Sequence, residues 1–283
     1  MKICRTIPEF RAALSGLRGE GKTLGLVPTM GALHDGHMAL VEAAKAECDA
    51  VAATIFVNPT QFGDPADLET YPRTEAEDLA LLKARGVAAV LIPEVGDIYP
   101  EGDETIVETT RLANMLHGEV RPGHYRGVCT VVTKLFNIAQ PDAAFFGEKD
   151  YQQLQVIRRM ARDLHMPIAI HGVPTQREDD GLARSSRNRR LTPEDRAAAP
   201  VLSRALAAAE EAVASGTTVE DLRTLIANTI TAEPRATMRA IDIVAPGTLA
   251  PVEGPVKAPI AIMLSAEFGG ILLIDQREIG VTH

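Results

Sequence analysis

The sequence predicts an α/β protein with two domains, a larger parallel-sheet domain over residues 1–178 and a smaller α+β domain over residues 179–283. Three observations support this organisation. Short apolar runs alternate with helix-length segments through residue 175, which is the pattern of right-handed βαβ units. A polar, charged stretch then interrupts the pattern. Beyond it, helical segments lead into strand patterns broken by Pro and Gly, as in a small antiparallel sheet.

The elements of the larger domain follow from the periodicity of apolar residues. The expected strands are residues 23–29, 50–58, 87–93, 143–147 and 166–173. The expected helices cover residues 8–18, a segment that starts at residue 36, and residues 74–85, 128–139 and 154–164. Because ligands of parallel sheets bind beyond the carboxyl ends of the strands, we expect a site in the loops that follow them.

The smaller domain is predicted to begin with helices. Thr192 is a good N-cap, Pro193 suits the first helical position, and two acidic residues follow in the first turn. An Ala-rich helix is expected to run to Ser215, and a second helix to start at Val219. After Arg235 the pattern changes to strands.

The amino-acid composition excludes some classes of protein. Of 283 residues, 46% are hydrophobic and the net charge is −9, so the chain can bury a core but repels nucleic acid. The densest basic stretch, residues 184–190, is interpreted as a local anion site. The N-terminus lacks a signal-like apolar region, and no run approaches the ~20 apolar residues of a spanning helix. We therefore expect a cytoplasmic protein with no nucleic-acid or membrane partner.

The three cysteines, Cys4, Cys48 and Cys129, are dispersed and form no CxxC pair. This usage is typical of reduced thiols in the cytoplasm. Cys48 and Cys129 fall in helical patterns and are predicted to lie in the core.

Residues 16–23, GLRGEGKT, match the P-loop pattern GxxxxGK[ST]. That loop binds phosphate only when it follows a strand and opens a helix. Here a predicted helix precedes the motif and a predicted strand follows it. We therefore interpret the motif as a helix end and a turn.

A second phosphate-binding candidate, PTMGALHDGH at residues 28–37, has the correct context between a strand and a helix. Gly31 and Gly36 allow the backbone to approach a ligand closely. His34 and His37 lie three residues apart at a positive helix end, where they can stabilise charge on phosphate oxygens. Two alternatives stay open: locally satisfied histidines, or a zinc pair, for which no third ligand is obvious.

A third candidate, Gly147 to Asp150, also follows a strand and opens a predicted helix. Lys149 can meet phosphate as a point charge, and Gln153 is expected one turn further on the same face. The alternative is a solvated surface lysine.

Two loops carry further polar candidates. Ser185, Ser186 and Arg187 combine hydroxyls with a guanidinium in a flexible loop, which suits departing pyrophosphate, although a polar linker has a similar composition. The Gln61 amide both donates and accepts, as an acid substrate with hydroxyls requires.

Together these segments resemble a known family. The HxGH pattern of residues 34–37 is similar to the signature of the nucleotidyltransferase superfamily, which includes class I aminoacyl-tRNA synthetases. Five blocks in order resemble the pantothenate synthetase (pantoate–β-alanine ligase) family. They are residues 28–37, VNPTQFGDPADLETYPR at 57–73, RPGHYRGVCTVVTKLFN at 121–137, FFGEKDYQQL at 145–154 and DGLARSSRN at 180–188.

The resemblance implies a Rossmann-like nucleotidyltransferase domain that binds ATP and pantoate, and a C-terminal lid that closes over it. The implied reaction condenses pantoate with β-alanine to pantothenate through a pantoyl-adenylate, and releases AMP and pyrophosphate. Mg²⁺ is expected to bridge phosphate oxygens, with its protein ligands unknown. The family is typically homodimeric.

The resemblance also assigns residues, and the catalytic group comprises His34, His37, Lys149, Ser185, Ser186 and Arg187. ATP contacts are implied for these residues and for Met30, Gly31, Gly147, Glu148, Asp150, Gln176 and Arg184. Pantoate contacts are implied for Gln61 and Gln153, and places on the substrate side for Tyr71, Arg121 and His124. One departure is Arg184, where the family usually has an apolar residue.

Rival functions fit the sequence less well. An adenylyltransferase that keeps AMP on its product would not need this length or the separate C-terminal domain. A tRNA synthetase would need an RNA-binding module. A non-catalytic nucleotide sensor would tolerate loss of HxGH, Lys149 and Ser-Ser-Arg, all of which are intact.

Overall fold

The computed structural model describes residues 1–63 and 65–281 and divides the chain into two compact units. Unit 1 comprises Met1–Gly147 and Gln152–Val173, and unit 2 comprises Glu148–Tyr151 and Pro174–His283. The boundary predicted at residue 178 falls a few residues after this division. The assignment of Glu148–Tyr151 to unit 2 has no counterpart in the predicted domains.

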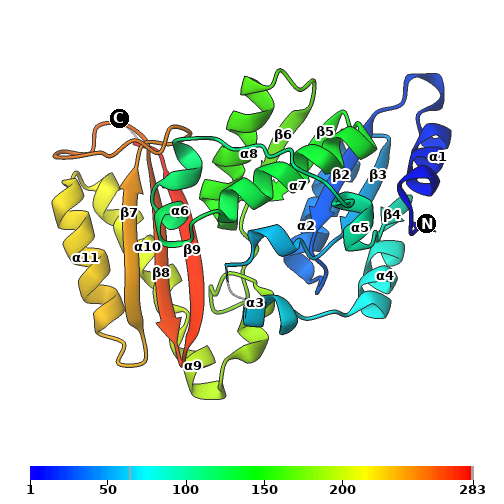
Figure 1. Cartoon of the computed structure of the whole chain (residues 1–283). Coiled ribbons are helices and arrows are strands. Elements are labelled where there is room, and N and C mark those ends of the chain that lie inside the picture. The colour runs from blue at the N-terminus through cyan, green and yellow to red at the C-terminus, as the bar shows by residue number, and fades with distance from the viewer. Residues whose placement is uncertain (64, 282–283) are drawn as a thin grey trace. The chain divides into compact units, whose positions relative to one another are not determined.

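Within the described residues, unit 1 is built on a parallel sheet of six strands in the order β1-β4-β3-β2-β5-β6 (Figure 1). The strands are β1 (Lys2–Cys4), β2 (Leu24–Thr29), β3 (Ala50–Ile55), β4 (Ala89–Leu91), β5 (Ala143–Gly147) and β6 (Ala169–Val173). The predicted parallel α/β fold is confirmed, and the short edge strand β1 is the addition. The central strands are mostly apolar, with Thr29 and Thr54 as the exceptions in β2 and β3, because both faces of the sheet are covered.

The longer helices of unit 1 lie close to their predicted positions. They are α1 (Ile7–Leu17), α2 (Asp35–Glu47), α4 (Glu75–Ala84), α7 (His124–Ala139) and α8 (Tyr151–Asp163), the last starting in unit 2. The shorter ones are α3 (Pro65–Glu69), α5 (Val95–Ile98) and α6 (His117–Val120). Helix α2 packs against β2, β3 and β5, while α1 and α7 pack against each other. The predicted apolar stripe of α7 is buried along its length, from Val128 to Ala139.

Unit 2 combines three helices with an antiparallel sheet in the order β7-β8-β9 among its described residues. The strands are β7 (Thr237–Val244), β8 (Ile260–Phe268) and β9 (Ile271–Ile279), and the helices are α9 (Pro193–Ala198), α10 (Val201–Ala214) and α11 (Val219–Thr231). Thr192 caps α9 as predicted, since its Oγ1 accepts from Asp195 N at 3.2 Å. The single Ala-rich helix expected up to Ser215 is wrong, because Pro200 divides it into α9 and α10.

The P-loop look-alike has the reversed order of elements that the sequence indicates. Helix α1 ends at Leu17, a 3₁₀ turn covers Gly19–Gly21, and β2 starts at Leu24. Lys22 is exposed in extended backbone between them. The motif therefore lies at the start of a strand, where no helix N-terminus follows it.

The cysteines are free thiols. Cys129 is buried within α7, and this burial raises the pKa of its thiol to about 11. Cys48 is the C-cap of α2 and only partly buried, so its predicted place in the core is only partly correct. Among the described residues no helix is both long and apolar enough to cross a membrane.

Candidate active site

The turn between β2 and α2 brings the two predicted histidines together. His34 is the N-cap of α2, and its Nδ1 accepts from Gly36 N at 3.1 Å. In return, the backbone N–H of His34 donates to Nδ1 of His37 at 3.3 Å. The ring centroids are 4.2 Å apart. The two imidazoles thus form a reciprocal cap at the positive end of α2, the place that favours an anion.

The capping bonds define the chemistry of the pair. Because each Nδ1 accepts a backbone N–H, each neutral ring carries its proton on Nε2. The pair therefore supplies N–H donors of the kind that bind phosphate oxygens. Across residues 1–63 and 65–281 there is no group of three or more His, Cys, Asp or Glu side chains that could hold a metal ion.

The shape of this turn depends on Asp78, which the sequence analysis missed. Asp78 is 1% exposed, and its carboxylate accepts from Ala32 N at 3.0 Å and from Leu33 N at 2.8 Å. Thr74 Oγ1 donates to the same carboxylate at 3.1 Å. Gly31 has a φ of +82°, and a Cβ there would come within 3.1 Å of Asp78 Oδ2. The buried carboxylate thus holds the turn, and Gly31 provides the room for it.

The loop after β3 gathers several predicted residues around Gln61. Gln61 belongs to a 3₁₀ turn, η2 (Pro59–Gln61), and its Nε2 donates to Met30 Sδ at 3.2 Å. His124 Nδ1 and Gln61 O are hydrogen-bonded at 2.9 Å. A predicted acid-binding residue, Gln61, therefore touches Met30, a predicted nucleotide contact. Beside them, Tyr71 packs edge-on against Phe62, with centroids 5.7 Å apart.

Arg121 follows α6 and its carbonyl accepts from His124 N at 3.1 Å, so these two predicted residues are neighbours. Gln153 lies in α8 and is half-buried, but within the described chain no hydrogen bond joins it to Gln61. Its neighbour Gln152 has a structural role, because its Nε2 donates to the carbonyls of Leu112 and Met115.

Lys149 lies in the 3₁₀ turn η4 (Glu148–Asp150), which belongs to unit 2 and packs against β9. Its side chain is only 19% exposed, with Nζ 3.6 Å from Asp150 Oδ2. Tyr151 anchors the turn by donating from its hydroxyl to Glu278 at 2.8 Å. Helix α8 starts at Tyr151, so Lys149 lies in the 3₁₀ turn directly before this helix and Gln153 lies within it.

The Ser-Ser-Arg segment follows a hydrogen-bonded hairpin. Arg184 N donates to Gln176 O at 2.8 Å, which sets these two predicted nucleotide contacts side by side. Ser185 then caps a 3₁₀ turn, η5 (Ser186–Arg190), by accepting from Arg187 N at 3.3 Å. The loop predicted to be flexible is thus internally bonded.

Arg177 and Asp275, which the sequence analysis also missed, hold this hairpin to β9. The Arg177 guanidinium donates to both carboxylate oxygens of Asp275, at 2.7 and 2.9 Å, and to Gly181 O at 3.0 Å. Asp275 is 2% exposed. A bidentate pair with a buried carboxylate fixes geometry as well as charge.

A parallel α/β unit with an HxGH pair capping the helix after its central strand is characteristic of the nucleotidyltransferase class of enzymes. Residues 2–278 match the family model for pantoate-beta-alanine ligase, and the chain belongs to this family. Pantothenate synthetase from Bartonella tribocorum is 50% identical over 277 residues, covering 98% of this chain and 97% of that protein. The pantothenate synthetase of Agrobacterium fabrum is 49% identical, covering 99% and 96%.

Solved structures agree with this assignment. The crystal structure of pantothenate synthetase from Thermus thermophilus superposes with a TM-score of 0.92 at 45% identity, covering 98% of this chain and 99% of that one. Pantoate-beta-alanine ligase from Francisella tularensis, complexed with beta-gamma ATP and beta-alanine, gives a TM-score of 0.81 at 35% identity, covering 98% and 97%. The family and the fold predicted from the sequence are therefore confirmed.

Proposed function

We propose that this chain joins pantoate to β-alanine at the expense of ATP and forms pantothenate, AMP and pyrophosphate. The observation that carries the proposal is the reciprocal cap of His34 and His37 at the start of α2, in a chain that matches the ligase family over residues 2–278. The Francisella relative, with its beta-gamma ATP and beta-alanine, supports the choice of substrates.

The reaction has two balanced steps. A pantoate carboxylate oxygen attacks the α-phosphorus of ATP, and the bond to the β,γ-phosphates breaks to release pyrophosphate. The amine of β-alanine then attacks the acyl carbon of the pantoyl-adenylate, AMP leaves with the electron pair, and the new amide loses a proton. Positioning and charge neutralisation dominate such phosphoryl chemistry, because the protein forms no covalent bond itself.

On the basis of the family, we assign one set of polar residues to charge stabilisation in the first step. The assigned residues are His34, His37, Lys149, Ser185, Ser186 and Arg187. The wider ATP contacts are Met30, Gly31, Gly147, Glu148, Asp150, Gln176 and Arg184. Gln61, Gln153, Tyr71, Arg121 and His124 are assigned to the acid substrate. Among these residues Gln61 has the strongest structural support, because it is hydrogen-bonded to Met30, to His124 and to the buried amide of Asn58.

We expect Mg²⁺ to enter with ATP as part of the substrate. Asp78 is a buried acid that is hydrogen-bonded to the turn carrying HxGH. Both of its carboxylate oxygens already accept from backbone N–H groups. The described residues contain no acidic or histidine cluster suited to a resident metal. A magnesium ion held mainly by triphosphate oxygens and water fits this donor set. It would neutralise charge on the departing pyrophosphate.

We also propose that the protein is cytoplasmic and homodimeric, on the basis of its family. Exposed apolar side chains of unit 1, including Val95, Ile106 and Val120, are compatible with a subunit contact.

The adenylate step is tested by exchange of labelled pyrophosphate into ATP. We expect exchange with pantoate in the absence of β-alanine, and none with unrelated acids. Exchange that requires the amine would contradict an adenylate formed first. A product that retains AMP would instead favour an adenylyltransferase.

Lys22→Ala is expected to leave kcat and the KM for ATP nearly unchanged. Lys22 is exposed and lies ahead of β2, so it has no helix N-terminus with which to share a phosphate. Steady-state kinetics of the purified variant provide the measurement. A loss of ~10²-fold with the fold intact, the size expected for a catalytic phosphate contact, would show that the nucleotide site has been misplaced.

Gln61→Leu is expected to weaken pantoate activation while ATP binding changes little. Leucine keeps the volume but leaves polar groups of the acid and of Asn58 unpaired, at ~1–3 kcal/mol for each uncompensated contact. Pantoate-dependent exchange measures the first effect, and calorimetric titration with ATP measures the second. If both affinities fall together, Gln61 is a scaffold or nucleotide residue.

A further inference from the structure

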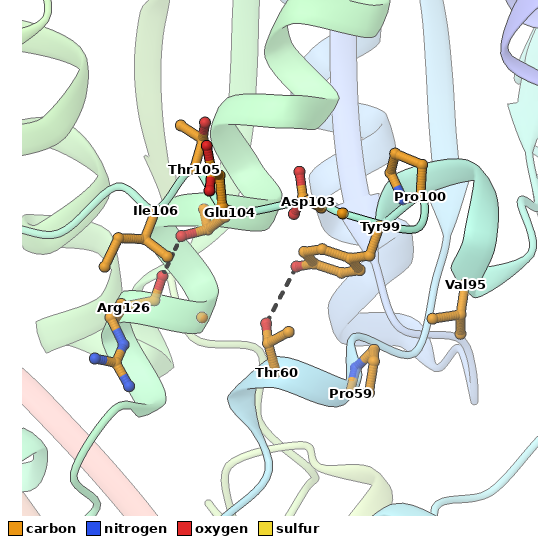
Figure 2. A pocket seen from close by; sticks show the side chains of 13 residues that line it. Pro59, Thr60, Val95, Tyr99, Pro100, Asp103, Glu104, Thr105, Ile106 and Arg126 are labelled. Carbon is orange, nitrogen blue, oxygen red and sulfur yellow. Dashed lines mark hydrogen bonds between the residues drawn. The ribbon is translucent and has the colours of Figure 1, made fainter.

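Behind the loop that carries Gln61, unit 1 contains a pocket of about 540 Å³. Its wall includes Thr60, Tyr99, Asp103 and Arg126, and Figure 2 shows the Tyr99 hydroxyl pointing toward Thr60. The two oxygens are 3.1 Å apart. Nothing in the proposed chemistry uses this pocket or Tyr99. A chain of hydrogen bonds nevertheless connects the Tyr99 hydroxyl to the oxygen of the Gln61 amide, whereas Met30 contacts the nitrogen of the same amide.

The chain runs through Asn58, which is 1% exposed. Tyr99 Oη donates to Asn58 Oδ1 at 2.8 Å, and Thr60 Oγ1 donates to the same oxygen at 2.9 Å. Asn58 Nδ2 donates to Gln61 Oε1 at 3.0 Å and to Gly127 O at 3.2 Å. The Thr60 backbone N–H can only donate and points to Asn58 Oδ1 at 3.4 Å, while the Gly127 carbonyl can only accept from Asn58 Nδ2. These two backbone groups permit one orientation of the Asn58 amide, and in that orientation the Tyr99 hydroxyl donates to Oδ1.

That orientation determines the orientation of Gln61. Because Gln61 Oε1 accepts from Asn58, Nε2 must point the other way, where it lies 3.2 Å from Met30 Sδ. An amide that is rotated by half a turn would place two N–H groups against each other, and a buried mismatch of this kind is costly. Gln61 thus offers its N–H side toward Met30.

Tyr99 itself is held in place. Lys134 Nζ lies 4.4 Å from the centroid of the Tyr99 ring, and is fixed by Asp103 Oδ2 at 2.7 Å and by Ile98 O at 2.8 Å. Burial raises the pKa of the Tyr99 phenol, so the hydroxyl remains a donor throughout the usual assay range. The chain therefore starts from a fixed donor.

We propose that Tyr99 is a positioning residue for the acid substrate: by donating to Asn58 it strengthens the arrangement in which the Gln61 amide points its N–H groups toward the acid. This inference rests on the proposed role of Gln61. It deepens that role, because the group of the acid that meets Gln61 must be a hydrogen-bond acceptor, such as a carboxylate or hydroxyl oxygen.

Tyr99→Phe tests the proposal, because it keeps the ring under Lys134 and removes only the hydroxyl. We expect the KM for pantoate to rise about 3- to 10-fold, the scale of one lost hydrogen bond, with the KM for ATP and the melting temperature nearly unchanged. If Tyr99 served only the stability of the fold, the substitution would lower the melting temperature or raise both KM values. An unchanged pantoate KM would overturn the proposal.

A double-mutant cycle with Gln61→Leu separates this inference from the role of Gln61 itself. If the chain operates through Gln61, Tyr99→Phe causes no further loss in the Gln61→Leu background. Independent, multiplying losses would overturn the relay and leave the acid role of Gln61 standing. A Gln61→Leu protein with normal pantoate activation would instead remove the acid role, and the relay with it.

Discussion

His37→Ala is expected to lower kcat by about 10²–10³-fold, the scale for losing one preorganised donor that stabilises developing charge. In the structure, His37 Nδ1 accepts from His34 N, which places its N–H donor on Nε2 at the start of α2. Folding should survive, because the residue is only partly buried. Steady-state turnover and a thermal melt of the same preparation provide the measurement.

Two matched variants distinguish the cap from the donor. The His37→Asn side chain reaches the position of Nδ1, so it can accept from His34 N but provides no group at the position of Nε2. The His37→Gln side chain reaches the position of Nε2 and carries an N–H donor there. We expect the Asn variant to be as slow as the Ala variant, and the Gln variant to recover part of the rate. The reverse order would mean that His37 serves the cap alone.

Lys149→Met should reduce pantoate-dependent pyrophosphate exchange by a similar factor, about 10²-fold or more. Methionine retains most of the volume of a side chain that is 19% exposed, and it removes the charge. Its partner Asp150 is 48% exposed, so water can replace the lost ion pair and the fold should persist. The effect therefore reports on phosphate chemistry more directly than Lys149→Ala.

Lys22→Ala is the matched lysine control for this experiment. Both substitutions remove one positive charge from the acidic chain, but only Lys149 lies in the turn that follows the β5 strand. Equal rates for the two variants would remove Lys149 from the mechanism. A Lys149→Arg protein that regains part of the exchange would show that the charge is the required property.

Most of the fold could be predicted because strands β2, β3 and β5 are buried on both faces and appear as continuous apolar runs. The edge strand β1 was not predicted, because three residues are too few to show a periodic pattern. The break between α9 and α10 was hidden because Ala-rich sequence continues on both sides of Pro200. A helix-breaking proline was the available signal.

Some residues of the candidate site could also be predicted from the sequence, and others could not. The HxGH turn could be recognised because its residues are contiguous and follow a strand. The roles of Asp78, Asn58 and Arg177 could not be recognised, because their hydrogen-bond partners are either distant in the sequence or backbone groups. Asp78 bonds Leu33 across 45 positions, and Arg177 bonds Asp275 across 98. Asp78 stands in the first turn of α4 together with Glu75 and Glu77, so the local sequence does not set it apart from a helix-start acid.

The membership of Glu148–Tyr151 in unit 2 affects how the protein can be dissected. The chain passes from one unit to the other after Gly147, after Tyr151 and again after Val173. A single proteolytic nick or a gene fragment starting at residue 174 would therefore yield a C-terminal piece without Lys149 and without the Tyr151–Glu278 hydrogen bond. Such a C-terminal piece is not the whole of unit 2, and a fragment-complementation system for this enzyme would have to supply residues 148–151 along with it.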